Sequence, residues 1–394
     1  MKRWPTKTLG SFCQTGSGGT PSRGRPEYFD DGTVPWVKSG ELKESVVLNT
    51  AEKITVAATK ETNAGIVPKN AVLVAMYGAT VGETAILGMD AATNQAVCHI
   101  IPDQNTAHFR FVWYALKSRL DELLSKRVGG AQPNISQGII RNTVVPLPPL
   151  TEQERIVKLL DEADELRKLR AQADRRTAAL FHELFGDPMD NPRGWPSCPV
   201  SSFVEELYGG RSVNPAGADE ATGRFRVLKI SAVTWGEFKP EESKPVSASY
   251  EPPESHFVRA GDLLFSRANT TELVAATSYV FDTPPNLLLP DKLWRFVWKQ
   301  PKVVEPLFVW WLFQAPSVRR ELGQRATGTG GSMKNISKPK VMSLEVPVPP
   351  LPLQKEFAER VAEIREMGAV QAASRQRIES LFQSMLHRAF NGEL

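Results

Sequence analysis

Pro146 to Ile156 reads PLPPLTEQERI, and Pro347 to Phe357 reads PVPPLPLQKEF at a distance of 201 positions. The same shift carries Pro133-Asn134-Ile135-Ser136 onto Lys334-Asn335-Ile336-Ser337. Each half of the chain thus has a proline-rich segment followed by a long pattern that is typical of a helix. A repeat of this length predicts two similar globular units and two similar helices.

The repeat continues into the globular part of each half. Gly18-Gly19 corresponds to Gly209-Gly210, and Lys38 corresponds to Lys229, both with a shift of 191 positions. Because the matched segments keep one order along the chain and differ only by small insertions, we interpret the sequence as an internal duplication.

The length and composition of the chain indicate a folded protein with more than one core. A chain of 394 residues is longer than one ordinary domain. Its composition, with 41% hydrophobic and 23% charged residues, is that of a folded protein and excludes an intrinsically disordered one. The net charge of +4 is mildly basic, so it permits a nucleic-acid partner without requiring one.

Cysteine usage and hydropathy bear on the compartment. Cys13, Cys98 and Cys198 are widely spaced and odd in number, which argues against a disulfide framework or zinc site and favours a reducing compartment. Met1 to Pro5 has no apolar stretch like that of a signal peptide, and no apolar run approaches the roughly 20 residues that span a membrane. We therefore expect a cytoplasmic protein without a membrane partner.

The first long helix has a capping-box pattern at its start, where Thr151 precedes Glu154 by three positions. Pro352 takes the place of this threonine in the second helix, which a first helical turn tolerates. Apolar residues then recur at spacings of three and four, which predicts the seam of a coiled coil. The predicted seam residues are Ile156, Leu159, Leu166 and Leu180 in the first helix, and Phe357, Ile364, Ile378 and Leu381 in the second.

Both predicted seams become polar in the middle, at Arg170 and Thr177 in one helix and at Gln371 and Ser374 in the other. In an antiparallel pair the two centres lie side by side, and a buried polar layer helps to fix register and orientation. We therefore predict antiparallel packing, with the globular units at opposite ends. The alternative is that these polar residues face solvent, in which case the helices remain spacers.

Several segments of the first half form an ordered series of motifs: GGTPS (Gly18 to Ser22), VPWVKSGEL (Val34 to Leu42), YGATVGETAI (Tyr77 to Ile86), Asn94-Gln95-Ala96 and the PLPPLTEQERI junction. On these segments the chain resembles the specificity subunit of type I restriction–modification systems over essentially its whole length. The second half departs from this pattern at Gly210-Arg211-Ser212 and at Ser266 to Thr270. Such proteins are expected to differ in their recognition domains. The departure therefore concerns the DNA contacts of individual residues in the second half.

The resemblance implies a mixed α+β fold with a pseudo-two-fold arrangement of duplicated domains and two long antiparallel coiled-coil helices. The implied regions are target-recognition domain 1 at 1–150, a central helical spacer at 151–187, target-recognition domain 2 at 188–351 and a C-terminal helical spacer at 352–394. Each domain would read one half-site of double-stranded DNA through the major groove, with the helices holding the half-sites apart. Because the domains differ in sequence, we expect an asymmetric, bipartite target.

The implied partners are DNA, two modification (methyltransferase) subunits and restriction subunits. We expect no cofactor on this chain, with S-adenosylmethionine on the modification subunit and ATP and Mg²⁺ on the restriction subunit. A methyltransferase would need a glycine-rich cofactor loop and an Asn/Asp-Pro-Pro-aromatic motif. The sequence contains neither a glycine-rich loop followed by an obvious helix nor that motif. Asp31 with Glu41-Leu42-Lys43 has a nuclease-like spacing, but the repeat-equivalent Ala232-Val233-Thr234 lacks it. We therefore expect neither catalysis nor a metal site.

Arginine, lysine and small hydroxyl side chains on loops are the residue types that contact phosphates and base edges. The candidates in the first half are Thr20, Ser22, Arg23, Arg25, Lys38, Tyr77 and Thr80, and those in the second half are Arg211, Ser212, Lys229, Arg267, Asn269 and Thr270. The alternative for each is an ordinary solvated loop residue. Lys38 and Lys229 recur at equivalent positions, and we expect them to contact phosphates rather than bases.

Two further features leave more than one interpretation open. The glycine-rich turns Gly129-Gly130 and Gly328 to Ser332 could touch the DNA backbone or only turn the chain. The aromatic groups Phe111 to Tyr114 and Phe308 to Trp311 could stack on bases, but their spacing on an amphipathic helix favours the domain core. Part of that surface, or the outward faces of the long helices, could instead bind the modification subunits.

A different class of function also stays open, a non-catalytic protein-interaction scaffold with duplicated domains on a coiled-coil rod. Salt-dependent, sequence-specific DNA binding distinguishes the two, because neutralised phosphates release counterions. A third possibility is the specificity subunit of a related system in which modification and cleavage share one polypeptide.

Overall fold

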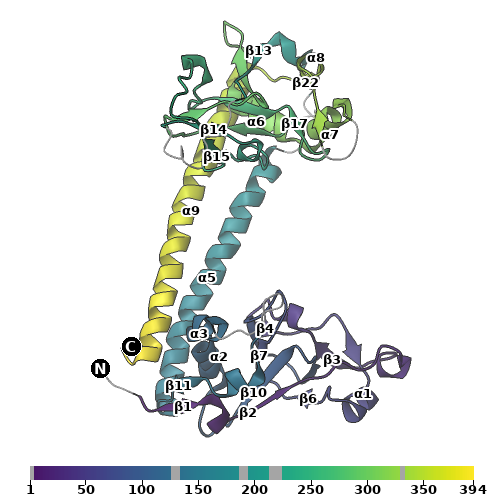
Figure 1. The fold of residues 1–394 in the computed structure, drawn as a ribbon, viewed down its shortest axis with the longest axis vertical. Coiled ribbons are helices and arrows are strands. Elements are labelled where there is room, and N and C mark those ends of the chain that lie inside the picture. Colours follow the sequence, from purple (N-terminus) through teal and green to yellow (C-terminus); the bar gives the residue numbers. More distant parts are fainter. Residues whose placement is uncertain (1–3, 126–133, 186–193, 213–223, 329–332) are drawn as a thin grey trace. The chain divides into compact units, whose positions relative to one another are not determined.

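Two compact units make up the structure (Figure 1). The computed structural model describes residues 4–125, 134–185, 194–212, 224–328 and 333–394. Unit 1 comprises Met1–Gln172 and Ala372–Leu394, and unit 2 comprises Ala173–Gln371. The two long helices, α5 (Leu150–Phe185) and α9 (Leu351–Asn391), therefore each contribute residues to both units. Among the described residues, no helix is long and apolar enough to cross a membrane.

Unit 1 combines mixed sheets with short helices. Its strands are β1 (Thr6–Thr8), β2 (Cys13–Ser17), β3 (Val34–Val37), β4 (Val46–Val47), β5 (Lys53–Ile54), β6 (Ile66–Val67), β7 (Val72–Ala75), β8 (Thr84–Leu87), β9 (Ala91–Thr93), β10 (Val97–Pro102) and β11 (Val144–Pro146). Its shorter helices are α1 (Val56–Glu61), α2 (Phe109–Ser118), α3 (Leu120–Ser125) and α4 (Gln137–Arg141). One sheet has the order β2-β10-β7-β8-β4, and another has the order β5-β3-β9-β6. β7 and β8 are buried at every position, as expected for short apolar runs in a core.

Unit 2 repeats this order of strands. Its strands are β12 (Ser197–Pro199), β13 (Val204–Gly209), β14 (Arg226–Leu228), β15 (Ser243–Pro245), β16 (Leu263–Ser266), β17 (Ala268–Asn269), β18 (Thr277–Tyr279), β19 (Leu287–Leu288), β20 (Leu293–Trp298), β21 (Lys334–Asn335) and β22 (Glu345–Pro347). Its shorter helices are α6 (Pro306–Gln314), α7 (Pro316–Arg325) and α8 (Lys338–Met342). The sheet β13-β20-β16-β18 has the same order as β2-β10-β7-β8 of unit 1. The pair β12-β22 likewise matches β1-β11.

The aromatic groups of α2 and α6 lie in the cores of their units. Phe111 to Tyr114 are buried, and so are Phe308, Val309 and Trp311. Trp310 is partly buried and donates from its indole N–H to the carbonyl of Gly236 at 3.3 Å. The interpretation of these groups as domain core is therefore confirmed.

A buried glutamine attaches each long helix to the globular part of its unit. Gln153 Oε1 accepts a hydrogen bond from the backbone N–H of His108 at 2.9 Å, and its amide donates to the carbonyls of Thr106 and Pro148 at 3.0 and 2.8 Å. Gln354 Oε1 accepts from the N–H of Glu305 at 2.8 Å. Both side chains are completely buried. His108 and Glu305 immediately precede α2 and α6, so the same contact recurs in both units, with the glutamines 201 positions apart and their N–H donors 197 positions apart.

The start of α5 corrects one sequence prediction. The helix begins at Leu150, and the backbone N–H of Gln153 donates to the carbonyl of Pro149 at 3.0 Å. Thr151 therefore lies inside the first turn, and the capping box predicted there is wrong. The polar residue that connects this junction is Gln153, which bonds both to the segment before α2 and to the carbonyl of Pro148 just before its own helix.

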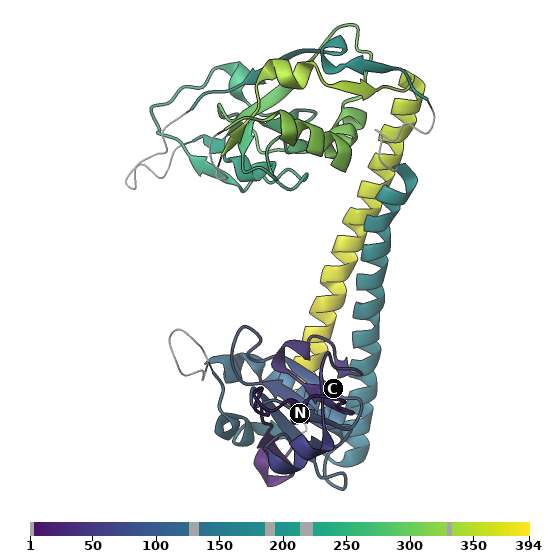
Figure 2. The same cartoon turned by 90° about the vertical axis from the view of Figure 1, so that its right-hand side faces the viewer.

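In unit 1 the first part of α5 and the last part of α9 lie side by side in both views (Figure 1 and Figure 2). The Arg155 guanidinium donates to the carbonyl of Leu394 at 2.9 Å, and Arg167 Nε donates to Glu379 Oε2 at 2.8 Å. Arg167 also lies over the ring of Phe382, 4.3 Å from its centroid. Along α5 the partners come from successively earlier positions of α9, which is the order of an antiparallel pair.

The predicted seam is only partly right. Ile156 and Phe357 are buried, and Leu159, Ile364 and Ile378 are partly buried. Leu166 and Leu381 are each 50% exposed, so the prediction is wrong at these two positions. The side chain of Leu180 lies outside the described part of the structure.

The physical reason for the error is a second apolar stripe beside the true seam. The inward positions of unit 1 are Ile156, Leu160, Ala163 and Arg167, which alternate by four and three residues. Leu166 directly precedes Arg167 and Leu381 directly precedes Phe382, so both lie next to the contact. Apolar periodicity could not distinguish the two stripes because Arg167, a charged residue, occupies the inward one.

The polar centre of the helices forms a direct contact in unit 2. Gln371 Nε2 donates to Thr177 Oγ1 at 2.8 Å, and both side chains are partly buried. The prediction that polar positions from the two helices meet is confirmed for this pair. Such a contact favours one register, because a shift would leave partly buried polar groups without partners.

We predict that Gln153→Ala and Gln354→Ala each lower the free energy of unfolding of their unit by about 1–3 kcal/mol, because a buried backbone N–H loses its acceptor. Chemical denaturation followed by circular dichroism measures the change. Gln172→Ala, at an exposed position of α5, is the matched control and should leave stability nearly unchanged. Equal effects of all three substitutions would contradict the assigned role.

Candidate nucleic-acid interface

Three loops of unit 1 are held together at the ends of strands. Gly18 lies so close to the carbonyl oxygen of Thr93 that an added Cβ would be 1.8 Å from it, which requires glycine at this position. The N–H of Gly19 donates to the same carbonyl at 3.0 Å, and the Trp36 indole donates to the carbonyl of Gly19 at 3.1 Å. The loop after β2, the end of β3 and the turn after β9 therefore form one local surface.

This surface brings together two of the predicted DNA-binding residues. Thr20 follows the glycines and donates from its hydroxyl to Gln95 Oε1. Lys38 follows Val37, whose carbonyl accepts from the N–H of Asn94 at 2.9 Å. Gln95 is exposed at the point where the loops meet. Sequence reasoning used Asn94-Gln95-Ala96 only as a family motif and missed this position as a functional candidate.

One carboxylate binds two of the predicted cations. Glu52 Oε2 accepts from Arg23 at 2.6 Å, and Glu52 Oε1 accepts from Lys38 Nζ at 2.6 Å. The hydrogen bond from Lys38, followed by that from Arg23, holds the pKa of the Glu52 carboxyl below its usual value. Arg23 also lies over the ring of Phe29, 4.5 Å from its centroid. Glu52 was missed in the sequence because nothing in its local pattern marks it.

The other candidates of the first loop lie on exposed backbone. Ser22 is exposed, and its carbonyl accepts from the N–H of Arg25 at 3.1 Å. Arg25 donates to Glu27 at 2.7 Å and lies 3.8 Å from Glu61. The hydrogen bond that Arg25 donates to Glu27 contributes most to raising the pKa of Arg25. Arg25 therefore has a set of partners separate from the Glu52 cluster.

Tyr77 and Thr80 lie on the turn between β7 and β8. Tyr77 pairs with Asn134 through a backbone bridge, and burial raises the pKa of its phenol. The preceding residue, Met76, donates its N–H to the carbonyl of Ala96 at 2.8 Å and accepts from the N–H of Ile135 at 2.7 Å. This turn therefore adjoins Gln95-Ala96, and the Asn-Ile-Ser segment supports it from the other side.

In unit 2 the corresponding surface surrounds a cavity of about 360 Å³. The residues lining it are Ser212, Val227, Leu228, Lys229, Ile230, Lys244, Pro290, Asp291 and Lys292. Lys229 lies 3.5 Å from Glu242 and, like Lys38, immediately precedes a short 3-10 helix. Arg267 Nε donates to the backbone carbonyl of Asp291 at 2.9 Å. The cavity is therefore lined by a hydroxyl residue, three lysines and Asp291, and Asp291 in turn contacts Arg267.

The remaining candidates of unit 2 are not among the residues that line this cavity. Arg211 is exposed on the segment before Ser212. Asn269 lies in β17, which pairs with β21, and its Oδ1 accepts from the N–H of Thr270 at 2.9 Å. The N–H of Ile336 donates to the carbonyl of Arg267 at 3.0 Å, as Ile135 does to Met76 in unit 1. Gly129-Gly130 and residues 329–332 lie outside the described residues.

A β-bulge corrects the alignment between the two units. The register of β13 against β20 shifts between Val204 and Glu206. Beyond it Gly210, not Gly209, takes the place of Gly18, because an added Cβ would lie 1.8 Å from the carbonyl oxygen of Leu289. The shift becomes 192 positions, and Ser212 rather than Arg211 corresponds to Thr20.

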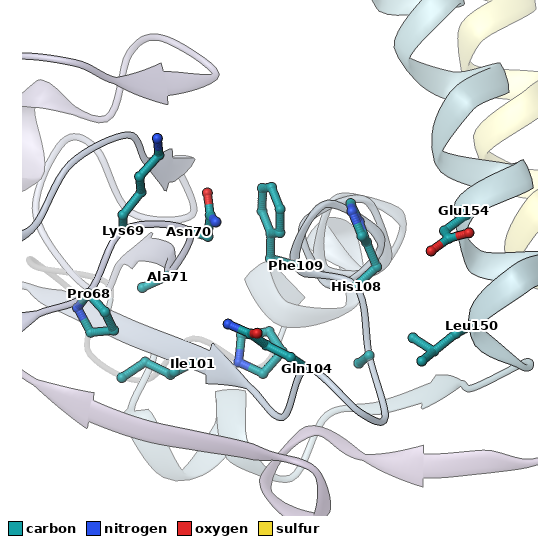
Figure 3. A pocket seen from close by; sticks show the side chains of 12 residues that line it. Pro68, Lys69, Asn70, Ala71, Ile101, Gln104, His108, Phe109, Leu150 and Glu154 are labelled. Atoms are coloured by element: carbon teal, nitrogen blue, oxygen red, sulfur yellow. The ribbon is translucent and has the colours of Figure 1, made fainter.

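A second cavity, of about 310 Å³, lies in unit 1 near the start of α5 (Figure 3). Lys69 and Asn70 approach it from one side and His108 and Glu154 from the other, with Phe109 between them. Burial lowers the pKa of His108. None of the predicted DNA-binding residues lines this cavity. Among the described residues, no group of three or more His, Cys, Asp or Glu side chains is arranged to hold a metal ion.

Known proteins provide an independent comparison. A family model described as "Type I restriction modification DNA specificity domain" matches residues 1–174. The EcoR124I/EcoR124II specificity subunit of Escherichia coli is 27% identical over 165 residues, which is 41% of this chain and 41% of that protein. The EcoKI specificity subunit of Escherichia coli K12 is 25% identical over 400 residues, covering 93% of this chain and 84% of that protein.

A solved structure shares the fold. It is described as "Structural basis underlying complex assembly and conformational transition of the type I R-M system", and it is 17% identical with a TM-score of 0.63. The match covers 99% of this chain and 98% of that chain. The family model covers the first 174 residues, and the similarity to the EcoKI subunit covers 93% of the chain. Residues 1–174 thus match the DNA specificity domain of type I systems, and the chain as a whole is similar to type I specificity subunits.

Proposed function

We propose that this chain recognises an asymmetric, bipartite DNA sequence, with one half-site read by each unit. The observation that carries the proposal is the recurrence of one surface in both units. A hydroxyl residue follows a close-packed glycine, at Thr20 and at Ser212, and a lysine follows the neighbouring strand, at Lys38 and at Lys229. Lysines bind phosphates, whereas hydroxyl and amide groups reach base edges.

The difference between the units supports an asymmetric target. Gln95 of unit 1 lies two positions before β10, and Asp291 of unit 2 lies two positions before β20, so the two residues are equivalent. An amide both donates and accepts, whereas a carboxylate only accepts, so the two surfaces match different base edges. Identical units would instead select a palindrome.

The chain acts without catalysis of its own, as part of a larger cytoplasmic complex. In this proposal two modification subunits methylate DNA with S-adenosylmethionine, and restriction subunits cleave it with ATP and Mg²⁺. The duplicated domains have a pseudo-two-fold relation, and α5 and α9 form an antiparallel coiled-coil spacer between the half-sites. The contacts of Arg155 with Leu394, Arg167 with Glu379 and Thr177 with Gln371 support antiparallel pairing.

The outward faces of the helices supply two equivalent docking surfaces for the modification subunits. Leu166 and Leu169 of α5 are 50% and 52% exposed, and Met367 and Val370 of α9 are 44% and 65% exposed. The two pairs are related by the repeat shift of 201 positions. Exposed apolar side chains of this kind favour protein association, and the repetition fits two copies of one partner.

Methylation mapping tests the proposed recognition. A host that expresses this chain with its modification subunit should methylate a split, asymmetric motif, because each unit reads a different half-site. Long-read sequencing measures the motif, and the same host without this chain is the control. A motif that persists without the chain, while the modification subunit is expressed, would refute the proposal and leave the protein-interaction scaffold.

Exchanging residues 1–150 for the equivalent region of another specificity subunit should change one half of the methylated motif and preserve the other. The physical reason is that the bases are contacted by separate units. Sequencing of the methylated sites measures the outcome. Simultaneous change of both halves would contradict independent reading.

The docking surfaces predict a change in stoichiometry. Leu166→Glu with Leu169→Glu, or Met367→Glu with Val370→Glu, should each remove one modification subunit, since a buried carboxylate opposes an apolar contact. Native mass spectrometry of the purified complex counts the subunits. Leu48→Glu, at an exposed apolar position away from the helices, is the control. Retention of both subunits by both double variants would exclude these surfaces.

A further inference from the structure

Each recognition surface holds its repeated lysine with a glutamate. Lys38 Nζ lies 2.6 Å from Glu52, and Lys229 Nζ lies 3.5 Å from Glu242. Both glutamates come from the segment leading into a neighbouring strand, β5 in unit 1 and β15 in unit 2. A solvated lysine needs no such partner to remain charged, so stabilisation of charge alone does not explain the recurrence.

The arrangement in unit 1 is the tighter one. Glu52 uses one oxygen for Lys38 and the other for Arg23, so it holds two cations with one carboxylate. Arg23 is further restrained over the ring of Phe29. Glu52 and Lys38 are both about one-third exposed, so the cluster remains accessible to a ligand from solution.

A DNA phosphate that approaches this cluster meets a carboxylate as well as the cations. Binding to DNA of any sequence depends on phosphate contacts and on the counterions they release. The carboxylate repels the phosphate and competes with it for Lys38 and Arg23. DNA with the correct half-site offers additional base contacts, which offset this repulsion, whereas other DNA does not.

On the basis of the proposed function, we propose that Glu52 is a positioning residue that suppresses binding to non-target DNA, and that Glu242 does the same in unit 2. Glu52 holds Arg23 and Lys38 in one geometry and opposes phosphate contacts that lack accompanying base contacts. Glu242 also accepts a hydrogen bond from Ser231 at 2.7 Å and lies farther from its lysine, so its effect is smaller.

The test measures binding of the assembled complex with its modification subunits to two duplexes over a range of KCl concentrations. One duplex carries the target mapped by methylation, and the other has the same length and composition without it. Glu52→Gln should raise the affinity for the second duplex about fivefold at low salt, as expected for removing one charge contact in water. The slope of log K against log[KCl] should steepen by about 0.9, which corresponds to one more neutralised phosphate.

Two variants separate positioning from a change in net charge or folding. Glu52→Asp keeps the carboxylate and should stay close to the wild type. Glu44→Gln removes the same charge from an exposed position of unit 1 and should leave the slope unchanged. Glu242→Gln should act in the same direction as Glu52→Gln but more weakly.

Distinct outcomes overturn the inference and the proposed function. The inference fails if Glu52→Gln leaves the affinity for the second duplex and its salt slope unchanged, or weakens both duplexes equally, while the wild type still prefers its target. It also fails if Glu44→Gln gives the same shift. A wild-type complex that binds both duplexes equally would refute the proposed function instead.

Discussion

The side-chain amide of one buried glutamine in each unit connects the globular part to the long helix. Gln153 and Gln354 accept from the N–H groups just before α2 and α6, where burial leaves no water to replace them. Because α2 and α6 carry the aromatic cores, each glutamine helps to attach the core of its unit to the long helix.

Each recognition surface carries acidic side chains beside its basic ones. Most of the candidate cations lie beside a carboxylate: Glu52 binds Arg23 and Lys38, Glu242 lies near Lys229, and Asp291 contacts Arg267. A surface of this kind gains less from phosphates alone and relies more on base contacts. Sequence-specific recognition and weak affinity for other DNA then have one physical origin.

The sequence could predict what depends on local pattern and repetition. The repeat identified Lys38 with Lys229, and helical spacing placed Phe111 and Phe308 in the cores. Prediction failed where a contact joins distant segments, as for Glu52 with Lys38, or where one inserted residue in β13 moves the equivalent glycine to Gly210. Leu166 was assigned to the seam because its apolar side chain marks a periodic stripe, whereas the inward position is Arg167.

We propose that each unit contacts its own half-site. Hydroxyl-radical footprinting of the assembled complex on its mapped target measures this directly. We expect two separate protected tracts, with Lys38→Ala weakening protection of only one and Lys229→Ala weakening protection of only the other. A single continuous tract, or equal loss from both tracts with either substitution, would contradict it.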